Sequence, residues 1–182
     1  GHPRVAVLDG GFQAWVATEG AVSDEPVAAT PADPYPYSRN PDGVVSAEAV
    51  LANLQSPEFT LVDARSPERF RGEQEPIDPV AGHIPGSLNR PLADNLTASG
   101  HFKAADILRS EWLALLGKVP LLGKVPLLGK VPPAAVVTTC GSGAAACHLL
   151  LSLEIAGLPG ARLYPGSWSE WIRDPVRPVA TV

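Results

Sequence analysis

Two short runs of apolar and β-branched residues most constrain what this chain can fold into: FTLVDAR at residues 59–65 and AAVVTT at residues 134–139. Each run has the length of a buried strand, and each is followed by a segment with helix-start signals or helical periodicity. Strands that alternate with helices need crossover connections, which make the strands parallel and place the helices on the faces of the sheet. The alternation therefore predicts an α/β fold, with a central parallel sheet flanked by helices on both faces.

Further elements of the same kind surround these two strands. Helices are predicted at residues 46–55, 66–72, 102–116 and 144–157. Ser46 is a candidate N-cap of the first of them. Residues 81–92 form a loop punctuated by glycine and proline with a brief extended segment, and residues 161–172 supply one more strand and turn.

The chain divides into three predicted parts. Residues 44–182 carry the complete alternation and form one domain. Residues 21–43 contain five prolines and almost no periodic apolar pattern, which is typical of an extended linker. Residues 1–20 combine an expected short buried strand at residues 4–8 with an apolar helix, like the end of an α/β domain whose beginning is absent. Because the chain also has no methionine, we expect a fragment or a processed product.

The hexamer LLGKVP occurs three times in succession within residues 115–132. A proline at every sixth position blocks both a helix and a central strand. The period is also far shorter than the repeat unit of a solenoid. We therefore expect an expanded surface loop, or a tandem duplication without a function.

Composition excludes several classes of function. The net charge is −5 and the charges are mixed, so neither a nucleic-acid footprint nor a polybasic membrane patch is present. No run has the length of a membrane span, and the first residues lack a signal-peptide pattern. The two cysteines, Cys140 and Cys147, are too few for a four-ligand zinc site and form a poor disulfide framework. We expect two reduced thiols, a cytoplasmic location, no metal and no organic cofactor.

Cys140 stands where the strand at residues 134–139 ends and a glycine-containing loop begins. Backbone N–H groups at such a strand-to-helix junction point into one small space, and Gly141 and Gly143 allow the backbone to curl tightly. A sulfur surrounded by donors favours the thiolate, which predicts a nucleophile. The alternative is that Cys140 is only a small buried apolar residue, as many free cysteines are.

Two chemistries use a cysteine in such a loop. A tyrosine-phosphatase-like site needs an arginine six residues after the cysteine to bind phosphate, and this chain has Ala146 there. In sulfur transfer, the thiolate takes a sulfur atom from a donor, holds it as a persulfide and passes it on. The six-residue loop from Cys140 to Ala145 favours sulfur transfer.

Four ordered motifs resemble one known family: LVDARSPERFRG, AGHIPGSLNRP, CGSGAAACH and LYPGSWSEW. Over residues 44–182 the chain resembles the catalytic C-terminal domain of two-domain rhodanese-type sulfurtransferases. VAVLDGGFQAW, at residues 5–15, resembles the end of the inactive N-terminal rhodanese domain. The resemblance implies a rhodanese-like fold, a persulfide on the loop cysteine, and an active site at the interface with an N-terminal domain that is missing here.

The resemblance also implies site residues. The residues after the cysteine are neutral, which is similar to the 3-mercaptopyruvate enzymes, whereas thiosulfate-specific members carry basic residues there to suit a dianion. Ser142 would move a proton or polarise the donor carbonyl, and Arg69 would bind the donor carboxylate, with Arg71 as the alternative. The predicted catalytic residues are Cys140 and Ser142, and the predicted substrate-binding residues are Arg69, Gly141, Gly143, Ala144 and Ala145.

The chain departs from this family pattern in three ways. Residues 73–80 contain no second arginine, and the loop ends in Gly143, Ala144 and Ala145 where the family has a branched residue and threonine. The histidine and aspartate thought to work with the loop serine lie in the first domain of the family.

We expect an enzyme in which Cys140 takes sulfur from 3-mercaptopyruvate and passes it to a thiol such as thioredoxin, or to cyanide. One alternative is a thiosulfate:cyanide sulfurtransferase with the same nucleophile. Another is a rhodanese module that binds or carries sulfur for a partner protein without turnover of a small donor.

Several neighbouring residues are predicted to be structural. Packing roles are expected for Cys147, His148, Trp168 and Trp171. His83 is expected to stabilise a turn, and Asp63, at its strand end, could position the neighbouring arginine.

Overall fold

Four short strands form the sheet at the centre of the structure, a computed structural model that describes residues 5–28, 33–34, 36, 40–117 and 132–182. The strands are β1 (Thr60–Asp63), β2 (Leu88–Asn89), β3 (Val136–Thr139) and β4 (Arg162–Leu163). They lie in the order β2-β1-β3-β4, and every neighbouring pair is parallel. In the central pair, Thr60 lies opposite Val136 and Asp63 opposite Thr139. The predicted α/β fold with a parallel sheet is confirmed.

The central strands β1 and β3 are buried along their whole length. Side chains alternate between the two faces, because successive residues of a strand point in opposite directions. Val62 and Val136 belong to one core cluster, whereas Leu61 and Val137 belong to the other. A parallel sheet covered on both faces needs apolar residues on both, which is why these strands read as continuous apolar runs.

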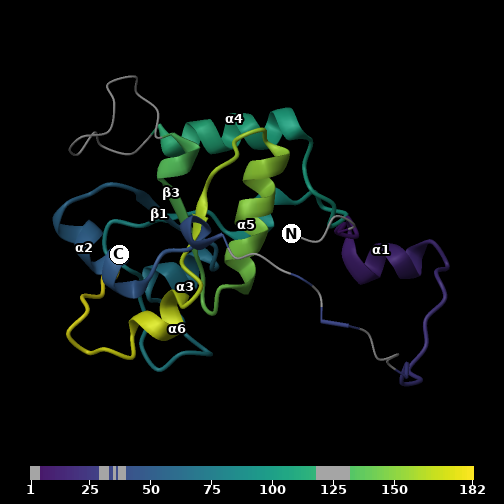
Figure 1. The fold of residues 1–182 in the computed structure, drawn as a ribbon, viewed down its shortest axis with the longest axis horizontal. Helices are drawn as coiled ribbons and strands as arrows, with labels where there is room; N and C mark the ends of the chain where they lie inside the picture. Colours follow the sequence, from purple (N-terminus) through teal and green to yellow (C-terminus); the bar gives the residue numbers. More distant parts are fainter. Residues whose placement is uncertain (1–4, 29–32, 35, 37–39, 118–131) are drawn as a thin grey trace.

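Helices cover both faces of the sheet, as predicted. The helices of the described residues are α1 Gly11–Ala17, which buries no residue, α2 Ala47–Gln55, α3 Pro67–Arg71, α4 Ala105–Leu116, α5 Ala144–Ile155 and α6 Ser167–Trp171, with the 3-10 turns η1 Pro41–Gly43, η2 Leu92–Asn95 and η3 Pro133–Ala135. In Figure 1, α4 and α5 lie on one side of β1 and β3, and α2, α3 and α6 lie on the other. Leu108 and Leu149 join the α4–α5 cluster, and Val50 and Trp171 join the α2–α6 cluster.

Several local predictions hold in detail. The Ser46 side chain accepts a hydrogen bond from the backbone N–H of Ala49, 3.3 Å away, and so caps α2. Trp168 and Trp171 are buried, and their indole N–H groups donate to the carbonyls of Val80 and Pro178. The packing roles of both tryptophans are confirmed. The segment 161–172 contains β4, as expected, and also the short helix α6, which the sequence did not indicate.

The N-terminal segment differs from its prediction. Residues 5–8 are exposed and lie outside any strand, so the buried strand expected at residues 4–8 is wrong over its described part. These residues pair with neither edge strand of the described sheet, so their backbone groups have no ladder to join. The apolar helix did form, as α1, and Asp9 Oδ1 accepts a hydrogen bond from the Phe102 N–H at 2.9 Å. The side chain of Trp15 in α1 is nevertheless 42% exposed.

Two further predictions concern the connections. Most of the hexamer repeat, residues 118–131, lies outside the described residues, and Leu115 and Leu116 complete α4. Residues 21–28 contain no helix or strand, and the division at residues 20 and 43 remains a prediction. Over the described ranges, no helix has both the length and the apolar character needed to cross a bilayer.

Candidate active site

Cys140 directly follows β3, at the carboxyl end of the sheet, and is 3% exposed. Its Sγ accepts a hydrogen bond from the backbone N–H of Gly143 at 3.1 Å. The loop therefore curls back far enough for one backbone N–H to reach the sulfur, as the sequence predicted for a tight glycine loop. The chemical role of that thiol remains a prediction.

The tight curl depends on glycine at position 143. Gly143 has a φ of +89°, in the left-handed region that L-residues avoid. A Cβ at this position would lie 2.5 Å from the carbonyl oxygen of Pro165, which is backbone and cannot move aside easily. Gly143 is thus required both by its own conformation and by the close approach of the loop before α6.

Helix α5 begins directly after this loop, at Ala144, with Gly143 as its N-cap residue. No side chain caps the helix, so the first N–H groups of α5 are open to the loop side. The aligned peptide dipoles favour negative charge at this end. Ser142 and Ala144 are exposed and Ala145 is half-buried, whereas Gly143 is buried, so the middle of the loop lies at the surface above a buried sulfur.

Residues of helix α6 form three hydrogen bonds with the cysteine loop. The backbone N–H of Cys140 donates to Ser167 Oγ at 3.1 Å. The backbone N–H groups of Trp168 and Ser169 donate to the carbonyls of Cys140 and Gly141, both at 2.9 Å. Ser167 is fully buried and has a φ of +53°, which is uncommon for a residue other than glycine. Sequence reasoning missed Ser167; its only signal was its place in the LYPGSWSEW motif.

Arg69, in α3, reaches the same loop. A Cβ built on Gly141 would lie 3.8 Å from both Nη1 and Nη2 of Arg69. The structure therefore brings Arg69 beside the cysteine loop, where the resemblance implied a carboxylate-binding arginine. Arg71 is engaged elsewhere: its side chain is 37% exposed and pairs with Glu73 at 2.7 Å.

Two carboxylates hold the Arg69 guanidinium. Glu75 accepts from Nε at 3.0 Å and from Nη2 at 2.7 Å, and Asp78 accepts from Nη2 at 3.2 Å. Burial raises the pKa of Glu75, but hydrogen bonds from Arg69 and from the N–H groups of Asp78 and Ile77 outweigh it and hold that pKa below its ordinary value. Glu75 is therefore ionised at neutral pH. Sequence reasoning did not identify Glu75 or Asp78.

A second arginine, Arg65, shares Glu75 with Arg69. Arg65 pairs with Asp63 at 2.8 Å and with Glu75 at 3.3 Å, and its guanidinium stacks 4.7 Å from the ring centroid of Trp168. Asp63 does hold the neighbouring arginine, as the sequence suggested. Glu75 joins the two arginines into one network.

The remaining candidates lie away from the sulfur or act structurally. His83 Nδ1 lies 2.7 Å from the carbonyl oxygen of Phe70, and the two rings stack. His148 stacks on Phe102, and burial lowers the pKa of its imidazole, which fits the predicted packing role. Cys147 is exposed, so its predicted core position is wrong. The helix α5 turns Ala146 and Leu149 inward, which leaves position 147 on the solvent side.

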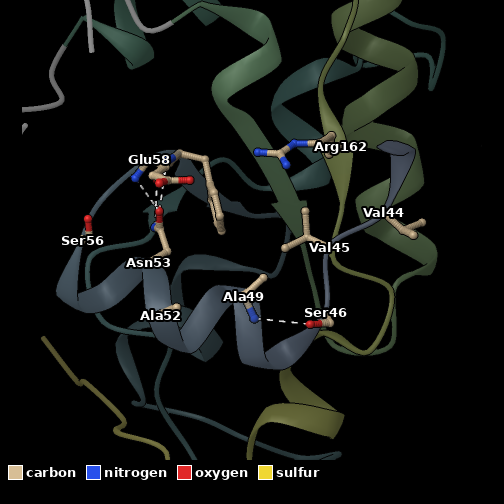
Figure 2. Close-up of a pocket in the computed structure, with 10 residues that line it drawn as sticks. Val44, Val45, Ser46, Ala49, Ala52, Asn53, Ser56, Glu58 and Arg162 are labelled. Atoms are coloured by element: carbon tan, nitrogen blue, oxygen red, sulfur yellow. Dashed lines mark hydrogen bonds between the residues drawn. The ribbon is translucent and has the colours of Figure 1, made fainter. Parts of the chain in front are cut away.

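A hollow of about 320 Å³ lies at the opposite end of the sheet, near the amino ends of β1 and β4 (Figure 2). It is lined by Val44, Val45, Ser46, Ala49, Ala52, Asn53, Ser56, Glu58, Phe59 and Arg162. Neither Cys140 nor Arg69 belongs to it. Among the described residues, no three or more His, Cys, Asp or Glu side chains are grouped to hold a metal ion.

Known proteins match the chain over most of its length. Residues 46–174 match the model of the rhodanese-like domain. The chain is 44% identical over 179 residues to a probable 3-mercaptopyruvate sulfurtransferase of Pseudomonas aeruginosa, covering 97% of this chain and 58% of the relative. It is 39% identical over 176 residues to a thiosulfate sulfurtransferase of Mus musculus, covering 95% of this chain and 54% of the relative.

A solved structure agrees on the fold. Wild-type EanB superposes with a TM-score of 0.74 at 24% identity, covering 98% of this chain and 41% of EanB. The chain thus spans somewhat more than half the length of the two sulfurtransferases named above, and less than half of EanB. With a matching family model, a shared fold and a cysteine loop at the carboxyl end of the parallel sheet, the chain belongs to the rhodanese-like domain family.

Proposed function

We propose that this chain carries the catalytic site of a sulfurtransferase, with Cys140 as the atom-transferring nucleophile. The observation that carries the proposal is the Cys140 sulfur, which accepts a hydrogen bond from the Gly143 N–H at the uncapped start of α5. Donors placed around a sulfur stabilise its negative charge, first as thiolate and then as persulfide. The names of relatives at 44% and 39% identity support the same reaction class.

In the first half-reaction, the Cys140 thiolate attacks the sulfur of 3-mercaptopyruvate. An S–S bond forms as the donor C–S bond breaks, and the electron pair of that bond passes to the enolate of pyruvate. The enolate then takes up a proton and leaves as pyruvate, and we assign the exposed Ser142 hydroxyl to this proton transfer. Arg69 would hold the donor carboxylate through its guanidinium beside Gly141.

In the second half-reaction, a nucleophilic acceptor attacks the outer sulfur of the Cys140 persulfide. The S–S bond breaks, its electron pair returns to Cys140 Sγ as thiolate, and the sulfur leaves on the acceptor. The proposed acceptor is a protein thiol such as that of thioredoxin, or cyanide. The outward-facing residues Ser142 and Ala144 leave the loop open to such a partner.

Thiosulfate is the second candidate donor, since one relative is named for it. The neutral residues Gly141, Ser142 and Gly143 favour 3-mercaptopyruvate, because a dianion would gain more from basic residues in the loop. A sulfur carrier that does not turn over a small donor is the alternative of another class. It would share the Cys140 persulfide but receive its sulfur from a protein.

The proposal also keeps the three-part division of the chain. Residues 44–182 contain both core clusters, whereas the apolar side chains of Phe12 and Val16 in α1 are 65% and 49% exposed. Exposed apolar groups of this size suit contact with another folded unit, for which we propose the N-terminal rhodanese-like domain. A cytoplasmic location would keep Cys140 and Cys147 as the free thiols seen here.

The test is intact-mass measurement after incubation with 3-mercaptopyruvate and, separately, with thiosulfate. We expect the parent protein and the Cys147→Ser variant to gain one sulfur atom, and the Cys140→Ser variant to gain none. The faster donor identifies the enzyme. The same measurement is repeated on a chain extended by an N-terminal rhodanese domain. If neither chain gains sulfur from either donor, the protein is not a sulfurtransferase that uses these donors.

A further inference from the structure

Arg69 presents only one edge of its guanidinium to the cysteine loop. Its Nε and Nη2 groups are occupied by Glu75 and Asp78. In the described part of the chain, Nη1 has no hydrogen-bond partner, and it lies 3.8 Å from the Cβ position of Gly141. The free Nη1 edge is therefore the part of Arg69 that a bound donor can meet.

The two carboxylates are themselves fixed. Glu75 accepts further hydrogen bonds from Arg65 and from the backbone N–H groups of Ile77 and Asp78. Its side chain is only 4% exposed, so it is held on all sides. The orientation of Arg69 is thus set before any donor arrives, which lowers the entropy lost on binding.

Asp78 connects the arginine to the cysteine loop by a second route. Its Oδ1 accepts from Ser169 Oγ at 2.8 Å, while its Oδ2 accepts from Arg69. The backbone N–H of Ser169 in turn donates to the Gly141 carbonyl. Asp78 therefore lies between the donor-binding edge and the loop that carries Cys140.

The charges of this network do not favour a doubly charged ligand. Three carboxylates, from Asp63, Glu75 and Asp78, surround the two guanidinium groups of Arg65 and Arg69. The Cys140 thiolate adds a further negative charge when it reacts. The segment that supplies Glu75 and Asp78, residues 73–80, contains no basic residue to offset them.

We propose that Glu75 and Asp78 form an acidic clamp that positions Arg69 and cancels its charge, so that the site selects singly charged over doubly charged sulfur donors. Glu75 is the positioning residue and Asp78 the specificity-determining one. This inference rests on the proposed function, since it names the donor charge that the Cys140 site accepts. A donor with one carboxylate meets the Nη1 edge, whereas a dianion is repelled by the clamp.

The test compares donors in the Asp78→Asn variant. Asparagine keeps the size and the acceptor oxygen for Ser169 but removes one negative charge. We expect the ratio of kcat/KM for thiosulfate to kcat/KM for 3-mercaptopyruvate to rise about fivefold. The effect is modest because the two donors differ by one unit of charge and the site lies near the protein surface. Glu75→Gln should raise KM for 3-mercaptopyruvate more than it lowers kcat, because the Arg69 guanidinium that binds the donor would be held less firmly.

The matched control is Glu73→Gln, which makes the same change in charge at the exposed pair with Arg71. We expect its donor ratio to equal that of the parent. A general folding defect would lower both rates together and leave the ratio unchanged. Equal donor ratios in the parent, Asp78→Asn and Glu73→Gln would overturn the inference while leaving sulfur loading of Cys140 intact.

A binding measurement separates this inference from the proposed function. Calorimetry with pyruvate as monoanion and sulfate as dianion requires no turnover. We expect Asp78→Asn to bind sulfate more tightly than the parent does, with pyruvate affected less. If Cys140 takes up no sulfur but this shift occurs, the proposed function fails and the charge selectivity stands; the absence of the shift refutes the acidic clamp.

Discussion

The two arginines of helix α3 each pair with a glutamate from the segment after the helix, and the two pairs lie in different surroundings. Arg69–Glu75 and Arg71–Glu73 each have a shortest N–O distance of 2.7 Å. The side chains of the first pair are 17% and 4% exposed, and those of the second are 37% and 52% exposed. The length of an ion pair therefore does not by itself indicate its contribution to stability. Water screens the outer pair, whereas the inner pair has exchanged its water for fixed partners.

The largest difference should appear when each glutamate is removed. Glu75→Ala leaves the Arg65 and Arg69 guanidinium groups short of a buried partner, and we expect the free energy of unfolding to fall by about 3 kcal/mol. Glu73→Ala should cause no measurable change. Urea denaturation of both variants checks this, and equal midpoints would show that the inner pair is no more important than the outer one.

Two glycines with positive φ also differ in whether their surroundings are crowded or open. Gly143→Ala would place a Cβ 2.5 Å from the Pro165 carbonyl oxygen, whereas Gly86, with a φ of +76°, has no heavy atom within 4 Å of its Cβ position. We expect a loss of about 2 kcal/mol at Gly143 and about 1 kcal/mol at Gly86, where only backbone strain acts. Sulfur loading should be impaired in the Gly143 variant alone. Thermal unfolding and intact-mass measurement test both statements, and full loading of Gly143→Ala would contradict the close fit of the loop.

A smaller effect should come from replacing each arginine by lysine. An ammonium group cannot hold Glu75 and Asp78 and still offer a planar edge to a carboxylate. For Arg69→Lys we therefore expect kcat/KM for 3-mercaptopyruvate to fall about tenfold, the equivalent of one charge-assisted hydrogen bond. Arg71→Lys should match the parent. Steady-state kinetics measures both variants. An unchanged kcat/KM for Arg69→Lys would show that Arg69 does not bind the donor.

The smallest effect is the dependence of stability on pH. Because the pKa of Glu75 is lowered in the folded state, its contribution is complete above its unfolded value of 4.5 and is lost as the pH falls through the folded pKa. Between about pH 6 and about pH 3, Glu75→Gln should therefore lose less stability than the parent does. Glu73→Gln should follow the parent once salt is added. Urea titrations across this range measure the difference; parallel curves for Glu75→Gln and the parent would refute it.

Sequence reasoning succeeded where the determinants are local. The apolar β-branched runs at residues 60–63 and 136–139 predicted buried parallel strands, and the glycines around Cys140 predicted a curled loop. It failed at residues 5–8, because an apolar run indicates a strand but cannot supply the neighbouring strand that would pair with it. It also failed at Cys147, because the apolar helix α5 gives little indication of which face packs inward.

The two central strands, the helices α2 to α5 and the glycine loop after β3 could be predicted from the sequence, because each depends on residues close together in the chain. The surroundings of the Cys140 sulfur, in contrast, depend on contacts between distant parts of the chain. Ser167 meets Cys140 across 27 residues, and Asp78 meets Ser169 across 91. Such contacts depend on how crossover connections return to one edge of the sheet, and no local pattern of polar residues specifies which of them will meet there.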